Sequence, residues 1–444
     1  MMNHRNGRFA AVDHQSSAAS RSGPRAGGHR VALYSHDTMG LGHMRRNLLI
    51  AQALMRSPRA PSVLMLAGAR EAGALRLPPG VDCLTLPALG KDPQGRLRAR
   101  HLDLTLSELI RLRSTILAAA LEAFRPDVLI VDKVPRGASE ELVPALELLK
   151  ASSDCRCVLG LRDVLDDPRA VRLEWAETQS DEAIARYYDA VWVYGDPALY
   201  DPVAEYGFSS AVAQKVRYTG YLDPKLRLSS PEPGGIEALS RLGLPDEGLI
   251  LCQLGGGQDG AELAEAFVHA ELPPGSHGVL LTGPYLPADA RERVRLAAEG
   301  RPRLRVLETL AEPGWLLRRA DRVIAMGGYN TVSEILSFEK PALIVPRISP
   351  RREQWIRAER LSNHGLLDVL HPDDLTPEAL ARWMAGPTSA RPSGRSRFDW
   401  SGLEKLPRLL EDLLVTPYRN IPCSYAESEE FGCPSMLPSE SATS

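Results

Sequence analysis

Short runs of apolar, β-type residues alternate along the chain with longer stretches in which apolar positions recur at helical spacing. The strand-like runs of the first half cover residues 31–35, 62–67, 127–131, 157–161 and 190–193. Between them, a helix is predicted over 44–55, where Met44 and Leu48 fall on the same face. This alternation indicates parallel β-α-β units with right-handed crossovers, and hence an α/β fold with doubly wound parallel sheets.

The alternation is interrupted by a Pro-, Ser- and Gly-rich passage and then begins again, so the sequence predicts two domains built on the same plan. We expect a disordered leader over 1–29, an N-terminal α/β domain over 30–218, a C-terminal α/β domain over 219–384, a linker with an amphipathic helix over 385–414, and a disordered tail over 415–444. Because open α/β sheets bind ligands at the carboxyl ends of their strands, the two domains should face each other across a cleft.

The composition narrows the class of protein. The 444 residues exceed the size of a single hydrophobic core, and 44% apolar with 25% charged residues is ordinary for a globular protein. A formal net charge of -3 argues against a nucleic-acid partner, because no overall positive field would attract phosphates. The six cysteines lack metal-ligand spacing, no apolar run is long enough to span a bilayer, and the N-terminus lacks a secretory signal. We therefore expect a cytoplasmic protein without a metal or another cofactor.

The turn "TMGLGHMRRN" joins the first predicted strand to the first predicted helix. It combines Gly42 and the imidazole of His43 with the cations Arg45 and Arg46. One interpretation is a strand-to-helix turn that needs glycine, with a histidine that packs or caps and arginines that face solvent. The other is a site in which backbone amides, the imidazole and the arginines face an anionic ligand. The residues leave both interpretations open.

Two glycine turns stand out in the second half, each directly after a predicted strand. In "LGGGQDG", the glycines Gly255, Gly256 and Gly257 precede Gln258 and a helix predicted from about Ala261. Without a Cβ the backbone can approach a ligand closely, and the unpaired N–H groups at the helix start attract anions. A tight β–α turn without a ligand fits the same residues equally well.

The second turn, "AMGGYNTVSEILSF", places Gly327 and Gly328 before a helix that we expect to start near Thr331. Thr331 and Glu334 have the spacing of a capping box, in which the carboxylate of Glu334 bonds back to the helix start. Spacing alone favours this structural role. In the alternative, Glu334 faces the cleft and accepts hydrogen bonds from two vicinal sugar hydroxyls.

Downstream, a loop with Arg347 and the pair Arg351–Arg352 leads to a helix predicted from Glu353. Glu353 and Gln354 lie in its first turn, where acidic residues commonly complement the helix dipole. A neighbouring carboxylate and amide also suit sugar hydroxyls, which need acceptors and donors together. The arginines are candidates for binding an anion, or they are solvated surface charges.

The sequence "GGYNTVSEILSFEKPALIVPR" followed by "EQWIRA" resembles the nucleotide-sugar-binding half of MurG-type glycosyltransferases, which add GlcNAc to a lipid-linked peptidoglycan precursor. "LGGGQDG" is similar in placement to the glycine-serine-glutamine turn of that family, with Gly257 where serine is usual, and "YSHDTMGLGHMRRNLLIAQAL" resembles predicted MurG-related bacterial glycosyltransferases. In layout, the resemblance covers roughly residues 30–385. It implies the GT-B architecture, with two Rossmann-like domains, an acceptor site in the first, a nucleotide-sugar donor site in the second, and no essential metal.

The glycine turns and the resemblance together predict the donor-binding residues Gly42, Gly255, Gly256, Gly257, Gln258, Gly327, Gly328, Asn330, Thr331, Glu334, Glu353 and Gln354. The resemblance implies Glu334 on the donor ribose, Thr331 near the diphosphate, and Gln354 on the sugar hydroxyls. It implies the region 306–310 beside the base, and it favours the ligand-binding interpretation of Glu334 over the cap. The sequence departs from the family at Leu41–Gly42, which replaces a glycine pair, and the acceptor-side loops show no match.

These features predict an inverting, metal-independent glycosyltransferase that moves a hexose or N-acetylhexosamine from a nucleotide diphosphate sugar, a UDP-sugar by resemblance, to an unidentified acceptor. His43 is the candidate catalytic base, because a neutral imidazole can take a hydroxyl proton. Asp37 and Asp163, each near a predicted strand end, are the substitutes. Helix starts and arginines would stabilise the leaving pyrophosphate.

Other functions stay open on the sequence alone. A UDP-sugar hydrolase of the same fold would use His43 to activate water, and a non-catalytic nucleotide-sugar-binding protein would keep only the second-domain site. A UDP-GlcNAc 2-epimerase is disfavoured, because no carboxylate-rich pattern is visible. The resemblance implies an acceptor that is lipid-linked or a glycan, and peripheral contact with the inner face of a membrane. The basic loop 90–101 either binds anionic headgroups or is solvated.

Overall fold

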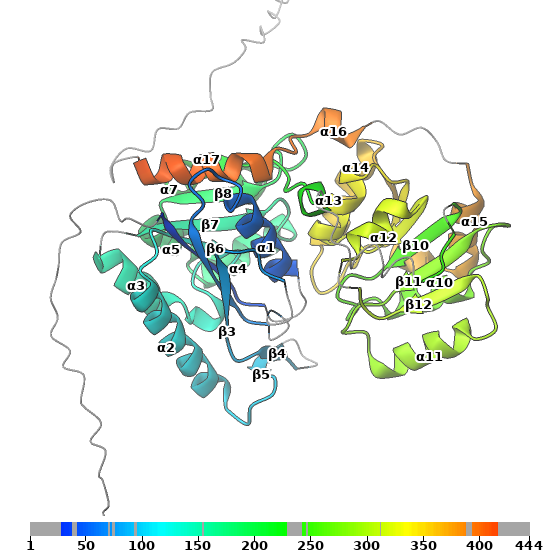
Figure 1. The fold of residues 1–444 in the computed structure, drawn as a ribbon, viewed down its shortest axis with the longest axis horizontal. Coiled ribbons are helices and arrows are strands. Elements are labelled where there is room, and N and C mark those ends of the chain that lie inside the picture. Colours follow the sequence, from blue (N-terminus) through cyan, green and yellow to red (C-terminus); the bar gives the residue numbers. More distant parts are fainter. Residues whose placement is uncertain are drawn as a thin grey trace, which may run out of the picture.

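The computed structural model describes residues 28–415, with gaps at 38–41, 70–71, 73–75, 93–95, 153–154, 229–241, 246, 311 and 388–392. In this part of the chain, two α/β lobes lie side by side (Figure 1). Each lobe is built around a parallel sheet, so the predicted α/β fold with doubly wound parallel sheets is confirmed. The predicted leader and tail lie almost entirely outside the described residues.

The N-terminal lobe contains a parallel sheet in the order β3-β2-β1-β6-β7-β8-β9. Its strands are β1 Arg30–Ser35, β2 Ser62–Ala67, β3 Val81–Thr85, β6 Val128–Asp132, β7 Arg156–Arg162, β8 Ala190–Tyr194 and β9 Val216–Tyr218. Strands such as β6 and β8 are buried along their whole length, which explains why they consist of nearly continuous apolar residues. The chain order reverses between β1 and β6, at the point where open sheets bind ligands.

The C-terminal lobe repeats this plan with the parallel order β12-β11-β10-β13-β14-β15. Its strands are β10 Leu249–Gln253, β11 His277–Leu281, β12 Leu304–Leu307, β13 Arg322–Ala325, β14 Ala342–Ile344 and β15 Asp368–Val369. The reversal of chain order here falls between β10 and β13. These are the two strands that precede the predicted glycine turns. An antiparallel hairpin of β4 Leu89–Lys91 and β5 Leu97–Ala99 stands outside both sheets.

Helices cover both faces of each sheet (Figure 1). In the N-terminal lobe they are α1 Gly42–Leu54, α2 Leu106–Phe124, α3 Val143–Ser152, α4 Pro168–Glu177, α5 Ser180–Tyr187, α6 Pro202–Tyr206, α7 Ser210–Ala213 and α8 Lys225–Leu228, with a 3-10 turn at Ala138–Glu140. In the C-terminal lobe they are α10 Ala261–His269, α11 Ala288–Ala298, α12 Gly314–Arg319, α13 Tyr329–Ser337, α14 Glu353–Asn363 and α15 Pro377–Ala385, with a 3-10 turn at Pro372–Asp374.

The end of the described chain returns to the N-terminal lobe. After α16 Gly394–Arg397, the predicted amphipathic helix is present as α17 Gly402–Val415, and it packs against α1 (Figure 1). Its buried residues Leu403, Leu406, Leu410 and Leu413 recur at helical spacing on one face. This helix therefore ties the chain that leaves the second lobe to the helix that carries the N-terminal turn.

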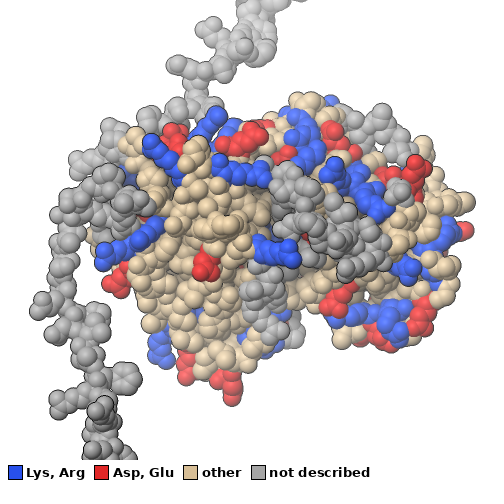
Figure 2. All heavy atoms as spheres, viewed as in Figure 1, with Lys and Arg blue, Asp and Glu red and all other residues tan. Residues whose placement is uncertain are grey.

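The surface gives no sign of a nucleic-acid site on the face drawn in Figure 2. Over the described residues in that view, basic and acidic side chains are interspersed rather than gathered by sign. A nucleic-acid site usually requires a basic patch or stripe. In the described part of the chain, none of the helices has the length and apolar character needed to cross a bilayer.

Candidate active site

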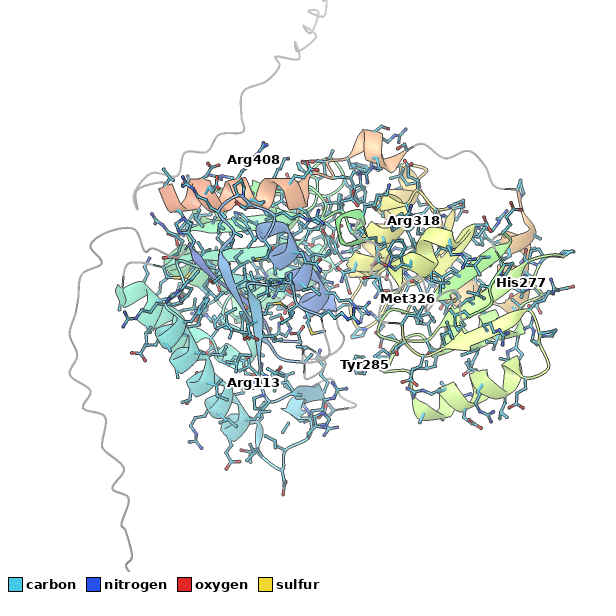
Figure 3. The ribbon with its side chains drawn as sticks, viewed as in Figure 1. Arg113, His277, Tyr285, Arg318, Met326 and Arg408 are labelled. Atoms are coloured by element: carbon cyan, nitrogen blue, oxygen red, sulfur yellow. The ribbon has the colours of Figure 1, made fainter. Side chains whose placement is uncertain are left out.

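A cleft runs between the two lobes, where the carboxyl ends of both sheets meet. It encloses about 1620 Å³ and is lined from both lobes, by His36 and the start of α1 on one side and by Gly255 and α13 on the other. Met326 and Tyr285, both in the lining, lie on the side of the C-terminal lobe that faces the N-terminal lobe (Figure 3). Sites for one small molecule usually enclose about 300–1,000 Å³, so this cleft has room for two ligands.

The first glycine turn joins β10 to α10 and contributes to one wall of the cleft. Gly255 and Gly257 have φ angles of 67° and 91°, in the left-handed region that favours glycine. A Cβ on Gly257 would lie 2.1 Å from the carbonyl oxygen of Thr282, whereas a Cβ on Gly255 would meet no described atom within 4 Å. As predicted, α10 begins at Ala261, and no described side chain caps its start. Its first N–H groups are therefore available to an anion.

We expect Gly257→Ala to destabilise the protein much more than Gly255→Ala. Both changes force a side chain into the left-handed region, at a cost of about 1–2 kcal/mol, but only Gly257→Ala also drives a Cβ into a backbone carbonyl. The free energy of unfolding of both variants, measured by denaturant titration, checks this expectation. Equal losses for the two variants would contradict the packing of this turn.

The second glycine turn joins β13 to α13 on the same wall. α13 begins at Tyr329, with Gly328 as its N-cap, two residues earlier than predicted. Thr331 therefore lies inside the first helical turn, no side-chain cap forms among the described residues, and the capping-box interpretation of Glu334 is wrong. Glu334 is 8% exposed and lines the cleft together with Gly328, Asn330 and Thr331.

Glu353 and Gln354 lie side by side at the start of α14, where they line the cleft as predicted. The side-chain oxygen of Gln354 accepts a hydrogen bond from the backbone N–H of Arg347 at 3.1 Å. The guanidinium of Arg347 binds Glu353 and, at 3.1 Å, Asp259. A Cβ on Gly327 would lie 2.8 Å from the carbonyl oxygen of Gln354, so the second glycine turn packs directly against this helix start. Arg347 is thus held by two carboxylates rather than exposed to solvent.

His43 lies on the opposite wall, in the first turn of α1. Its Nδ1 is hydrogen bonded to a carboxylate oxygen of Asp132, the last residue of β6. Arg46, one turn along α1, donates from Nη2 to both carboxylate oxygens of Asp132 at 2.7 Å. Nη2 of Arg46, which only donates, also lies 3.0 Å from Nδ1, but the contact of Nδ1 with the carboxylate is shorter. Because a carboxylate only accepts, we assign the imidazole proton to Nδ1, which leaves Nε2 as the basic nitrogen. A carboxylate that orients an imidazole in this way is typical of a general base.

The protonation states of His43 and Asp132 agree with a general-base role for His43. Burial lowers the pKa of His43, against an opposing influence of Asp132, so the imidazole is neutral at pH 7. Burial alone would raise the pKa of Asp132, but Arg46 and His43 outweigh it and hold that pKa well below its usual range. A neutral imidazole beside an ionised carboxylate can accept a proton, because the resulting imidazolium is stabilised.

Asp132 was not among the residues predicted from the sequence, and the position of Arg46 differs from the prediction. Asp132 ends the predicted strand "DVLIVD" at the switch point of the sheet, and this position was the one signal that could have marked it. Arg46 was expected either to bind phosphate or to face solvent, but it is 2% exposed and paired with Asp132. The solvent-facing interpretation of Arg46 is therefore wrong, and its charge stabilises the carboxylate that orients His43.

The two carboxylates offered as substitute bases are bound elsewhere. Asp37 accepts hydrogen bonds from the hydroxyl of Ser35 at 2.5 Å and from the N–H of Gly68 at 3.1 Å. Asp163 is 0% exposed and bonded to Arg357 at 2.6 Å. Neither belongs to the cleft lining that the described residues form. The substitute-base interpretations are therefore wrong, and His43 stays the candidate.

Several hydrogen bonds join the lobes across the cleft. The side-chain amide of Asn330 donates to the carbonyl oxygen of Gly42 at 3.0 Å, so the N-terminal turn touches the second glycine turn. Arg351, one of the predicted anion-binding arginines, instead binds Glu174 at 3.0 Å and Asp166 at 3.5 Å in the N-terminal lobe. These contacts bring His43 and the C-terminal glycine turns into one site.

Parts of the chain are similar in sequence to known proteins. Residues 258–385 match the family model described as Glycosyltransferase family 28 C-terminal domain. Over 150 residues, the chain is 31% identical to UDP-N-acetylglucosamine--N-acetylmuramyl-(pentapeptide) pyrophosphoryl-undecaprenol N-acetylglucosamine transferase of Mycobacterium bovis, and equally to that of Mycobacterium avium. The match covers 34% of this chain and 36% of each relative, so it spans about a third of the length of these curated proteins.

Solved structures extend the likeness to both lobes. MurG from Acinetobacter baumannii has a TM-score of 0.50 at 15% identity, covering 86% of this chain and 99% of that chain. UDP-GlcNAc 2-epimerase from Methanocaldococcus jannaschii has a TM-score of 0.56 at 12% identity, covering 87% and 99%. At such identities the likeness establishes the fold alone, and the predicted GT-B fold is confirmed. The chain therefore has the GT-B fold, and its residues 258–385 match a glycosyltransferase family 28 C-terminal domain.

Proposed function

We propose that the protein is an inverting, metal-independent glycosyltransferase that moves a hexose or N-acetylhexosamine from a nucleotide diphosphate sugar to an acceptor hydroxyl. The observation that carries this proposal is the His43–Asp132 pair on one wall of the cleft, opposite two glycine turns that lead into helix starts. The family match of the second lobe supports a nucleotide-sugar site there. The names of the mycobacterial relatives favour a UDP-sugar as the donor.

In this proposal the second lobe binds the donor. The turns at Gly255–Gln258 and Gly327–Gly328 receive the diphosphate, because Gly255 and Gly328 leave open space and the starts of α10 and α13 offer unpaired N–H groups. Glu334 accepts hydrogen bonds from the ribose hydroxyls. Glu353 and Gln354 bind the sugar, whose hydroxyls need an acceptor and a donor together. The base lies beside the segment at 308–310, which lines the cleft.

The first lobe supplies the proton acceptor. As the acceptor oxygen attacks the anomeric carbon of the sugar, its proton passes to Nε2 of His43, and Asp132 stabilises the imidazolium that forms. The bond between the anomeric carbon and the β-phosphate oxygen breaks, and the leaving nucleoside diphosphate takes the bonding electrons. The helix starts stabilise the negative charge that develops on it. Attack from the face opposite the leaving group inverts the configuration.

We propose an acceptor and a cellular location for the protein from the names of its relatives. The names of the relatives contain a pyrophosphoryl-undecaprenol acceptor, which favours a lipid-linked acceptor here. Such an acceptor would place the protein in the cytoplasm, in peripheral contact with the inner face of the membrane. The basic hairpin of β4 and β5 borders the cleft through Lys91 and is the candidate contact.

Release of UDP from UDP-GlcNAc tests the proposed function. We expect release that depends on an added bacterial lipid extract, and about 10–100-fold weaker binding of UDP-GlcNAc in Glu334→Ala, because a charged hydrogen-bond acceptor is lost. Glu378→Ala, which removes an exposed carboxylate from the start of α15, is the matched control. Fast release without the extract would favour the hydrolase instead. Absence of release under all conditions, with UDP-GlcNAc bound, would favour the non-catalytic binding protein.

A further inference from the structure

A group of cations lies on the N-terminal wall of the cleft, beside the His43–Asp132 pair. Lys133 directly follows β6, Arg162 ends the neighbouring strand β7, and both line the cleft. Lys133 has a φ of 69°, which is uncommon for a residue other than glycine, and its N–H donates to the carbonyl oxygen of Gly160 at 2.8 Å. A backbone held in such a conformation is found most often at functional sites.

The two carboxylates whose charges act on Lys133 are already paired with other arginines. Glu174 binds Arg351 at 3.0 Å, and Glu353 is paired with an arginine of its own lobe. In the part of the chain that the structure describes, neither Lys133 nor Arg162 forms an ion pair, and Nε of Arg162 is buried without a hydrogen-bond partner. Both side chains are partly buried, and two partly buried cations without a counter-charge favour an anion between them.

The pKa values of the two side chains reflect their burial and the neighbouring positive charges. Burial, followed by the charges of Arg162 and Arg351, lowers the pKa of Lys133 to about 7. Burial also lowers the pKa of Arg162 to about 10, although Glu353 acts in the opposite sense. A bound anion would favour the charged form of both side chains and so reverse these shifts.

We propose that Lys133 and Arg162 form a subsite for an oxyanion of the acceptor, either a phosphate ester or a carboxylate. This inference rests on the proposed function, because it assigns the diphosphate of the donor to the glycine turns on the opposite wall. The acceptor is then an acidic molecule. Since Lys133 follows Asp132 directly in the chain, an anion held by Lys133 brings the rest of the acceptor close to His43.

Calorimetric titration at pH 6, where Lys133 is largely protonated, tests the subsite. UDP first saturates the donor site, and inorganic phosphate or glucuronate is then titrated in separate arms. We expect one of the two anions to bind, and about 10–100-fold weaker binding in Lys133→Gln/Arg162→Gln, because two charged hydrogen bonds are lost. Lys133→Arg keeps the charge and should retain binding. Arg169→Gln, which removes an exposed cation from α4, is the matched control.

Each result of the titrations either supports or overturns the proposed subsite. Binding of phosphate indicates a phosphate ester on the acceptor, and binding of glucuronate indicates a carboxylate. Binding of neither anion, or equal binding to the wild type and the double variant, overturns the subsite. Weaker UDP binding by the double variant would show that Lys133 and Arg162 bind the donor, which would also overturn the proposed acceptor subsite.

If the double variant does not fold, Lys133→Gln alone carries the test. If the wild type does not bind UDP, the proposed function fails, and titration of the anions without UDP still decides the subsite.

Discussion

Replacing His43 by alanine is expected to lower kcat for glycosyl transfer by about 10²–10⁴-fold, the usual contribution of a positioned general base. The affinity for UDP should stay unchanged, because His43 lies on the wall opposite the glycine turns. The fold should persist, since Asp132 keeps its ion pair with Arg46 at 2.7 Å. Steady-state kinetics together with UDP binding measured by calorimetry check this result.

The pH profile separates a base from a packing residue. A base must be neutral to accept a proton, and burial lowers the pKa of His43 below its ordinary value of 6.5. The rate in the wild type should therefore be retained down to below pH 6.5 and then fall with a single protonation. His371→Ala, which removes a histidine outside the cleft lining that the described residues form, is the control. Unchanged turnover in His43→Ala, with binding intact, would show that the base assignment is wrong.

Asp163→Ala is expected to cost about 3–5 kcal/mol of the free energy of unfolding, the largest loss of stability that we predict. Asp163 and Arg357 are 0% and 1% exposed and join the two lobes in an ion pair at 2.6 Å. Arg357 also donates to the carbonyl oxygen of Gly327 at 2.9 Å, so the pair supports the second glycine turn. Removal of Asp163 leaves a buried charge without a partner, and denaturant titration measures the cost.

Two further variants test the cause of this loss. Asp163→Leu/Arg357→Met removes both charges and should be less destabilised than Asp163→Ala, because no uncompensated charge stays in the interface. Glu292→Ala breaks an exposed pair with Arg295 on α11 and should cost much less than Asp163→Ala, because solvent screens an exposed pair. A loss in Asp163→Ala that is as small as that of Glu292→Ala would contradict the buried ion pair as a major support of the interface.

The fold was predictable because its signals are local. Strand β2 coincides with the predicted run 62–67, and α10 begins at the predicted Ala261, since apolar periodicity and glycine punctuation depend only on neighbouring residues. The resemblance of the second half was likewise carried by a contiguous stretch, and the family match covers 258–385. Sequence reasoning was therefore strongest where a motif and its structural role lie within one turn and one helix.

The site was less predictable because its contacts are distant in sequence. His43 and Asp132 are 89 residues apart, and only the pairing of β1 with β6 brings them together. The predicted capping box at Thr331 was wrong for a different reason. Its spacing was right, but Gly328 already has the extended backbone of an N-cap, so the helix starts earlier and leaves Glu334 in the cleft wall. Local spacing cannot show which of two adjacent starts the tertiary structure selects.

In the proposed function, the second lobe binds a nucleotide sugar through its pyrophosphate at the two glycine turns. The most direct test is to compare the affinities of UDP, UMP and uridine by calorimetric titration. We expect UDP to bind at least about tenfold more tightly than UMP, because the second phosphate adds contacts with the starts of α10 and α13. Equal affinities for UDP and UMP, or no binding of UDP at millimolar concentration, would contradict it.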